Sequence, residues 1–181
     1  MNDVNQKIID AIIKKAEAVC PDSLALIGLY ASVAIGDTYE KSDLDLLLLI
    51  NDAQGYQLSE AFILDDTEIG YDLYCTTWAM LEADAACGHA QLSRLLDSPF
   101  VYTKEQRAVQ RLESLRKKAL DLLASDARYD KAQAAIDHAK QMYADCFLTD
   151  SVAKLRTAAG IAILFLLDAV CFITADTSEK V

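Results

Sequence analysis

Two segments separated by nine residues, Leu29-Tyr30-Ala31-Ser32 and Ser42-Asp43-Leu44-Asp45-Leu46-Leu47-Leu48-Leu49-Ile50, are the most informative part of the chain for its fold. A turn of small residues ends the first apolar run, and two aspartates one residue apart open the second. Alternate side chains of a strand share a face, so we expect Asp43 and Asp45 to point the same way. Two carboxylates on one face of so apolar a strand are costly unless a cation or a proton neutralises them. The pattern therefore predicts a magnesium site at the start of a buried strand.

The composition excludes several classes of function. The chain has 181 residues and a net charge of −11, which argues against a nucleic-acid polymer as ligand because phosphate binding needs a basic surface. A small triphosphate remains compatible with an acidic protein if a metal ion carries the positive charge. The five cysteines are scattered without a C-x-x-C pair, which is typical of reduced thiols in a cytoplasmic protein and disfavours zinc.

The first half of the chain alternates between helical and extended patterns. We expect a short helical turn at Ala31–Gly36, just after the first apolar run. The remaining elements expected there are an amphipathic helix over Val4–Cys20, strands over Leu24–Tyr30 and Leu44–Ile50, and a strand hairpin formed by Ala61–Leu64 and Glu68–Cys75.

From residue 77 onward the pattern is mostly helical. The expected elements are a helix over Trp78–Leu96 capped by Thr77, a short extended piece over Phe100–Tyr102, and helices over Lys104–Ser125, Arg128–Phe147 and Asp150–Ala175. The predicted fold class is therefore α+β, with a mixed sheet flanked by helices and then an all-helical region. We expect the α/β domain to cover residues 1–103 and the helical bundle region residues 104–181.

The last helix is unusually apolar, since Thr157–Ala175 carries one charged residue, Asp168. The large apolar side chains favour membrane insertion by roughly 3–5 kcal/mol, and a central Asp opposes it by about 2.5–3.5 kcal/mol. This balance favours a buried helix of a soluble protein over a membrane span. Its surface must then be covered by its own domain, by further residues, or by a second copy of the chain in a homodimer.

A third carboxylate is needed if Asp43 and Asp45 are to hold a metal ion in octahedral oxygen geometry. Asp72 is the best candidate, because it is a lone acid in an otherwise apolar strand that pairing can bring beside the first two. Asp65 and Asp66 are weaker candidates, because they occupy a turn in which aspartate is common for backbone reasons.

Ser32, ten residues, Asp43-x-Asp45 and a later strand acid together resemble the signature of the nucleotidyltransferase superfamily, which has the DNA polymerase β-like fold. This superfamily includes aminoglycoside and lincosamide nucleotidyltransferases. The segment Gly70-Tyr71-Asp72-Leu73-Tyr74-Cys75-Thr76-Thr77-Trp78 is also similar to the corresponding downstream segment of one bacterial branch. The resemblance covers about residues 20 to 103, and Ala31 stands where the family has glycine.

The resemblance implies a role for each matching residue. Asp43 and Asp45 resemble the ligands of two Mg²⁺ ions, and Asp72 resembles the third acid, which is a metal ligand or the general base for the acceptor hydroxyl. Ser32 resembles the residue that holds the β- and γ-phosphates at a helix start, where free N–H groups bind anions. We expect Ala31 and Ser42 to contact the nucleotide beside it.

Two classes of function follow from these observations. The first is a cytoplasmic, Mg²⁺-dependent enzyme that transfers a nucleoside monophosphate from an NTP to a hydroxyl of a small, antibiotic-like acceptor. A protein hydroxyl is an alternative acceptor. The second is a catalytically weak or inactive binding or regulatory module of the same fold, similar to an antitoxin. Ala31 is compatible with this alternative, because its methyl group would occupy space near the phosphates.

Overall fold

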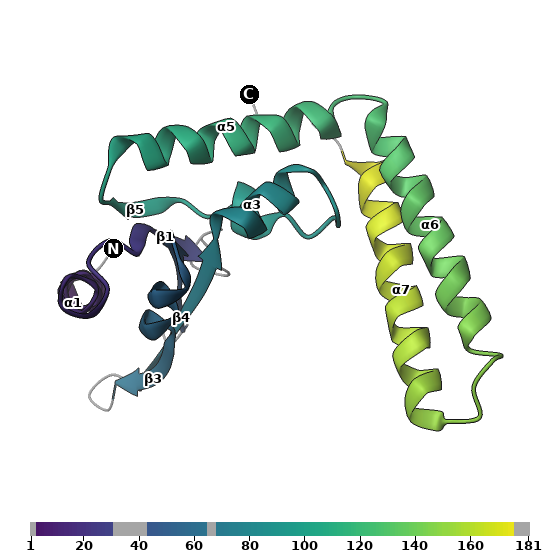
Figure 1. Ribbon diagram of the computed structural model, residues 1–181, viewed down its shortest axis with the longest axis horizontal. Helices are drawn as coiled ribbons and strands as arrows, with labels where there is room; N and C mark the ends of the chain where they lie inside the picture. The colour runs from purple at the N-terminus through teal and green to yellow at the C-terminus, as the bar shows by residue number, and fades with distance from the viewer. Residues whose placement is uncertain (1–2, 31–42, 65–67, 176–181) are drawn as a thin grey trace. The chain divides into compact units, whose positions relative to one another are not determined.

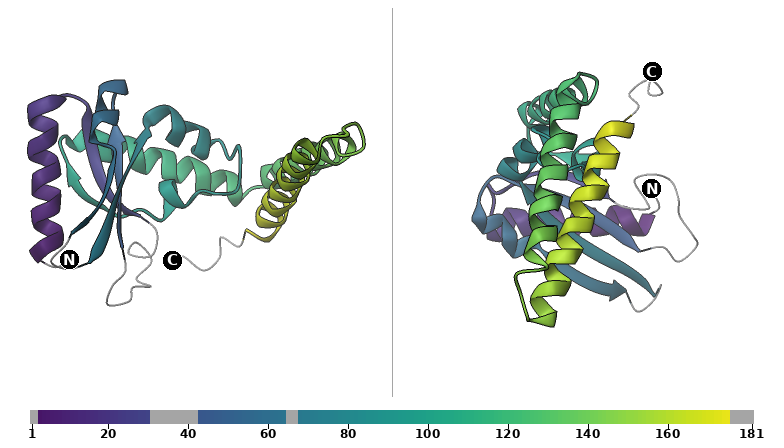
Figure 2. Two further views of the ribbon diagram at one scale, coloured as in Figure 1. Left: turned by 90° about the horizontal axis from the view of Figure 1, so that it is seen from below. Right: turned by 90° about the vertical axis from the view of Figure 1, so that its right-hand side faces the viewer.

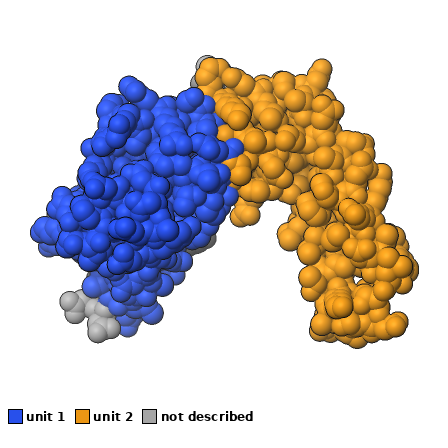
Figure 3. All heavy atoms as spheres, viewed as in Figure 1, with its two compact units in different colours: residues 1–82, 93–115 blue, residues 83–92, 116–181 orange. Residues whose placement is uncertain are grey.

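The computed structural model describes residues 3–30, 43–64 and 68–175, and it confirms the α+β class (Figure 1). The chain divides into two compact units (Figure 3). One consists of Met1–Glu82 with Ser93–Leu115, and the other of Ala83–Leu92 with Arg116–Val181. The first unit contains the sheet, and the second contains a pair of long helices.

The first unit is built on a five-stranded mixed sheet with the strand order β3-β4-β2-β1-β5. Its elements are α1 (Asp3–Val19), β1 (Leu24–Tyr30), β2 (Leu44–Ile50), η1 (Ala53–Leu58), β3 (Glu60–Leu64), β4 (Ile69–Thr77) and β5 (Phe100–Thr103). Strands β2 and β4 run parallel, whereas β1 pairs antiparallel with β2 and β5, and β3 pairs antiparallel with β4. The two strands around the Ser32–Asp45 stretch have the predicted bounds, and the predicted hairpin is confirmed as β3 and β4.

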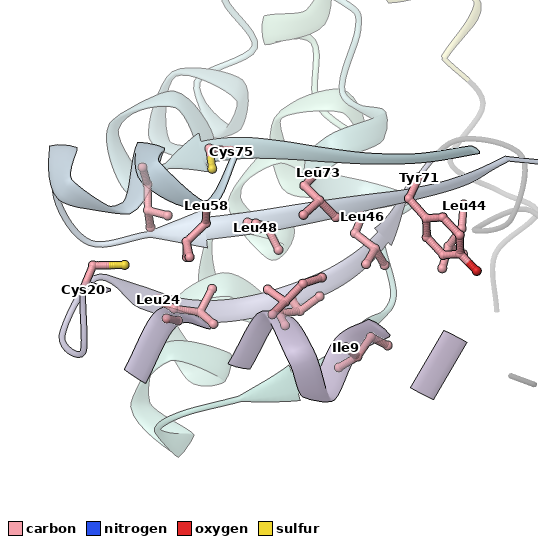
Figure 4. Close-up of a cluster of buried hydrophobic side chains, with 14 residues drawn as sticks. Ile9, Cys20, Leu24, Leu44, Leu46, Leu48, Leu58, Tyr71, Leu73 and Cys75 are labelled. Atoms are coloured by element: carbon pink, nitrogen blue, oxygen red, sulfur yellow. The ribbon is translucent and has the colours of Figure 1, made fainter. Parts of the chain in front are cut away.

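One face of the sheet packs against α1, which lies along it in Figure 2. The helix contributes Ile9, Ile12 and Ala16, whose spacing places them on one side of an α-helix. The strands contribute alternate residues to the same core: Leu44, Leu46, Leu48 and Ile50 from β2, and Tyr71, Leu73 and Cys75 from β4. Figure 4 labels Leu46, Leu48 and Leu73 among them. Because side chains alternate between faces, the residues between them, including the acids, point to the opposite face.

The opposite face is apolar at one end and acidic at the other. At the apolar end, Leu47 and Leu49 of β2 line a small cavity together with Leu81 of α3 (Trp78–Ala85) and Leu112 of α5 (Gln106–Leu123). Strand β2 is therefore buried on both faces there, which explains its unbroken apolar run. The acidic end lies where β2 begins.

The single helix predicted over Trp78–Leu96 is wrong, because the structure breaks it into α3 and a short helix, α4 (Ser93–Leu96). Cys87 adopts a left-handed backbone conformation with φ at 49°. The amides of Cys87 and Gly88 then donate to the carbonyls of Asp84 and Ala83, which ends α3. The predicted cap is confirmed, since the Thr77 hydroxyl accepts a hydrogen bond from the Met80 amide at 3.3 Å.

The second unit is dominated by α6 (Ala127–Asp145) and α7 (Val152–Thr174), which lie side by side (Figure 1). The three long C-terminal helices are confirmed, each ending within a few residues of its predicted bounds. Small buried side chains let α6 and α7 approach closely: Ala132, Ala135 and Ala139 of α6, and Ala162 and Ala169 of α7. Only 17% of the most apolar window of α7 is buried within the described part of one chain, so its own unit covers little of this helix, and its burial by a second copy or by further residues stays a prediction. By length and composition alone, α7 is a helix that could span a membrane.

Candidate active site

Strands β2 and β4 bring two of the predicted acids side by side. Asp45 of β2 pairs in register with Asp72 of β4, one position after the pair Leu44 and Tyr71. Matched residues of neighbouring parallel strands point to the same face, with backbones about 4.8 Å apart. Since Leu44 and Tyr71 face the core beneath α1, both carboxyl groups lie on the opposite face. Asp45 is half-buried there, and Asp72 is exposed.

Asp43 lies on the same side, immediately before β2. Its Oδ1 atom accepts a hydrogen bond from the backbone N–H of Gly70 at 3.0 Å. The carboxylate lies over Gly70 so closely that a Cβ atom on this glycine would be 2.5 Å from Oδ1 and 2.8 Å from Cγ. Gly70 is thus a positioning residue for Asp43 that the sequence analysis missed. The available signal was an isolated glycine inside a strand, which often marks a close approach by another group.

The electrostatic environment of Asp45 is unfavourable for a carboxylate. Burial raises the pKa of the Asp45 carboxyl above its ordinary value, and the nearby charges of Asp72 and Asp43 raise this pKa further. A bound cation would relieve both effects, because it would replace lost hydration and neutralise the like charges. The carboxylate oxygens of these acids are the donor type that Mg²⁺ prefers, so the residues present fit this ion.

The acids do not form a closed cage. Within residues 3–30, 43–64 and 68–175, no group of three or more His, Cys, Asp or Glu side chains is arranged to hold a metal ion. Mg²⁺ in phosphoryl-transfer sites takes one or two carboxylates from the protein and its remaining ligands from water and substrate phosphates. An open end of the sheet with Asp45 and Asp72 side by side agrees with that mode of binding.

Aromatic side chains border the acids on the β1 side. Tyr30 of β1 pairs in register with Asp45 and stacks on Tyr74 of β4, with ring centroids 6.3 Å apart and planes 19° from parallel. The Tyr30 hydroxyl lies 3.4 Å from the Ser93 hydroxyl. Tyr74 follows Asp72 by two residues on β4, so it lies on the same face of the sheet, between the acids and the apolar end.

The remaining predicted site residues lie outside the described part of the chain. These are the nucleotide-binding candidates Ala31, Ser32 and Ser42, together with the weaker acidic candidates Asp65 and Asp66. The helical turn predicted over Ala31–Gly36 lies there as well.

Trp78 lies at the C-terminal ends of β2 and β4, away from the acids at their N-terminal ends. It lines a cavity of about 590 Å³ with Asn51, Lys104 and Arg111. The indole N–H donates to the Asn51 side-chain oxygen at 2.9 Å, and the Arg111 guanidinium lies 4.3 Å from the ring centroid. These contacts give Trp78 a structural role that is separate from the acidic end of the sheet.

Comparisons with known proteins add no assignment. No family model matches the chain, and the search of curated proteins gives no match.

Proposed function

We propose that this protein is a Mg²⁺-dependent nucleotidyltransferase that transfers a nucleoside monophosphate from an NTP to a hydroxyl group of a small acceptor. The observation that carries the proposal is the pairing of Asp45 with Asp72 on adjacent parallel strands, where the pKa of Asp45 is raised. The spacing from Ser32 to Asp43 and Asp45 supports it through the resemblance to the polymerase β-like superfamily. The sheet, with β2 and β4 parallel at its centre, is compatible with that resemblance.

In this proposal the three acids have two roles, which are metal binding and proton transfer. Asp43 and Asp45 would hold Mg²⁺ through carboxylate oxygens. The Gly70 amide holds Oδ1 of Asp43 by a hydrogen bond, which orients the carboxylate and leaves its other oxygen for the metal ion. Asp72 binds metal or accepts the proton of the acceptor hydroxyl as that oxygen attacks the α-phosphate. When bound, Mg²⁺ supplies positive charge that stabilises the attacking and leaving oxygens of an in-line displacement.

The charge of the protein bears on the class of acceptor. With a net charge of −11, the protein attracts a cationic acceptor, such as a polyamine-like or aminoglycoside-like molecule that carries hydroxyl groups. The cysteines within the described residues are all free thiols, as expected of a cytoplasmic enzyme. We therefore place the proposed reaction in the cytoplasm, on a small hydroxylated cation.

The test is Mg²⁺-dependent release of pyrophosphate from each of the four NTPs in the presence of a panel of aminoglycosides and other hydroxylated amines. We expect Asp45→Asn and Asp72→Asn each to lower the rate by at least about 100-fold, because each removes a group that acts at the reacting phosphate. Glu60→Gln is the matched control, since Glu60 is an exposed acid of the neighbouring strand β3 that pairs with Lys15. Mg²⁺-dependent nucleotide binding without any turnover would instead favour the inactive regulatory module.

A further inference from the structure

The helical pair of the second unit carries a large apolar surface outside the proposed active site. Along α7 and the end of α6, large apolar side chains remain strongly exposed, with Phe147 73% and Leu164 62% accessible. We call this surface the hairpin face; it consists of Tyr143, Phe147, Leu148, Val152, Leu155, Ile163, Leu164, Leu166, Leu167, Val170 and Ile173. Single exposed apolar residues are common, but a contiguous set of this size indicates a binding surface.

The hairpin face has the form of a helix-binding groove. A cavity of about 600 Å³ runs between the two helices and is lined almost entirely by apolar atoms. Ile136 and Tyr143 of α6 form one wall, and Leu155, Ile163 and Leu166 of α7 form the other. In an α-helix, Ile163, Leu167 and Val170 fall on one stripe, because they are spaced four and three residues apart. The hairpin therefore offers both a groove and an adjacent apolar ridge.

The size of the hairpin face is that of a protein interface. Its eleven large apolar residues are each 39–81% exposed, so their accessible area together is on the order of 1,000 Å², whereas the largest apolar patch on a typical monomer is about 300–600 Å². A stable protein–protein interface buries about 800 Å² on each partner. A partner of similar size and apolar character would therefore remove most of this surface from water.

A lipid bilayer is a poor occupant of the hairpin face. Helix α6 packs along α7 and carries exposed charged side chains, with Asp137 on its outer side and Lys140, which pairs with it, at the edge of the groove. Inserting α7 into a membrane would bury those charges or separate α7 from α6, and each buried charge costs about 2.5–3.5 kcal/mol or more. Asp168 of α7 also accepts a hydrogen bond from the Ala90 amide at 3.0 Å, which ties α7 to the 83–92 segment of its own unit.

We propose that the hairpin face is the interface between two copies of this chain. Two hairpins related by a twofold axis place the α7 ridge of each copy into the groove of the other, which forms a four-helix bundle. A second copy is favoured as the partner because one hairpin carries both an apolar groove and an apolar ridge. The surface can therefore pair with another copy of itself. The polar outer side of α6 then faces water.

The experiment is the molar mass of the full chain by light scattering after size-exclusion chromatography at micromolar concentration. We expect about twice the chain mass of 19.9 kDa for the wild type. The double variant Ile163→Lys/Leu167→Lys should elute at the single-chain mass, because it places two charges at the centre of the interface. The matched control Ala134→Lys adds a charge to an exposed site on the outer side of α6 and should remain dimeric.

Two further measurements keep the proposal testable if the double variant unfolds. Leu167→Ala retains full helix propensity and should raise the dimer dissociation constant about tenfold or more. The melting temperature of the wild type should rise with protein concentration, as expected when folding and association are coupled. A monomeric wild type, a double variant that remains dimeric, or flotation of the wild type with phosphatidylcholine vesicles would overturn the proposal.

Discussion

Gly70→Ala perturbs the acidic end of the sheet without touching an acid. The added Cβ would lie 2.5 Å from Oδ1 of Asp43, so the carboxylate must swing away and give up its 3.0 Å hydrogen bond from the Gly70 amide. A hydrogen bond to a charged group is worth about 1.5–3 kcal/mol, and exposure of Asp43 favours the lower end. Replacing a strand glycine gains about 0.5 kcal/mol in backbone entropy. The variant should therefore lose about 1 kcal/mol of unfolding free energy.

The same substitution should weaken metal binding more than it weakens the fold. The Gly70 amide orients Asp43, and removing a group that orients a metal ligand typically lowers affinity about 10–100-fold. Urea unfolding measures the first effect, and a Mg²⁺ titration of nucleotide binding measures the second. Gly28→Ala is the matched control, because its Cβ would meet the Pro99 carbonyl oxygen at 3.5 Å, an ordinary contact. Unchanged stability and Mg²⁺ affinity in Gly70→Ala, or equal effects in Gly28→Ala, would show that Gly70 does not position Asp43.

Three further predictions concern Asp45, Asn51 and Cys75. The folded-state pKa of Asp45 is raised above 3.8, so in EDTA the wild type should lose stability as the pH rises through the window above that value. Asp45→Asn has no carboxyl group to ionise at this position, so it should melt at a higher temperature than the wild type at neutral pH but not below pH 3.8. The same dependence of melting temperature on pH in both proteins would contradict this. Asn51→Leu leaves the indole N–H of the buried Trp78 unpaired and should cost about 1–3 kcal/mol in urea unfolding, whereas a cost near zero would argue against the bond. Burial raises the pKa of the Cys75 thiol to about 11, so a thiol reagent at mildly alkaline pH should modify Cys75 only after unfolding. Peptide mapping that finds rapid labelling of Cys75 itself, and not only of the exposed Cys171, in the native protein would refute its burial.

The predictions that succeeded rest on local patterns. Strand β2 could be delimited because the alternating residues Asp43-Leu44-Asp45 lead into the apolar run Leu46–Ile50, which ends at a polar turn. The hairpin of β3 and β4 followed from two short strand-like runs around an acidic turn. The helices α5 and α6 followed from apolar residues at helical spacing, which does not depend on what packs against them.

The pairing of Asp45 with Asp72 needed information that no local pattern holds. Those residues meet because β2 and β4 are parallel neighbours in register, and the sequence did not distinguish parallel from antiparallel pairing. The contact between Gly70 and Asp43 depends on the same register. A shift of one residue would turn Asp72 to the other face of the sheet.

Two other features depended on contacts far apart in the sequence. The hydrogen bond from the Ala90 amide to Asp168 joins residues 78 positions apart, so it was not visible as a pattern. The end of α3 at Ala85 follows from the left-handed conformation of Cys87, which is rare for a residue other than glycine. Periodicity alone favoured a continuous helix there.

The proposed function depends on whether the acids at the start of β2 and β4 bind Mg²⁺ together with an NTP. The most direct measurement is the melting temperature with and without Mg²⁺ and each NTP, for the wild type, Asp45→Asn/Asp72→Asn and the control Glu60→Gln. At 100 times the dissociation constant, binding adds about 2.7 kcal/mol, which raises the melting temperature of a chain of this size by about 5–10 °C. We expect this Mg²⁺-dependent rise in the wild type and in Glu60→Gln and its loss in the double variant. No such rise in the wild type, or an equal rise in the double variant, would contradict it.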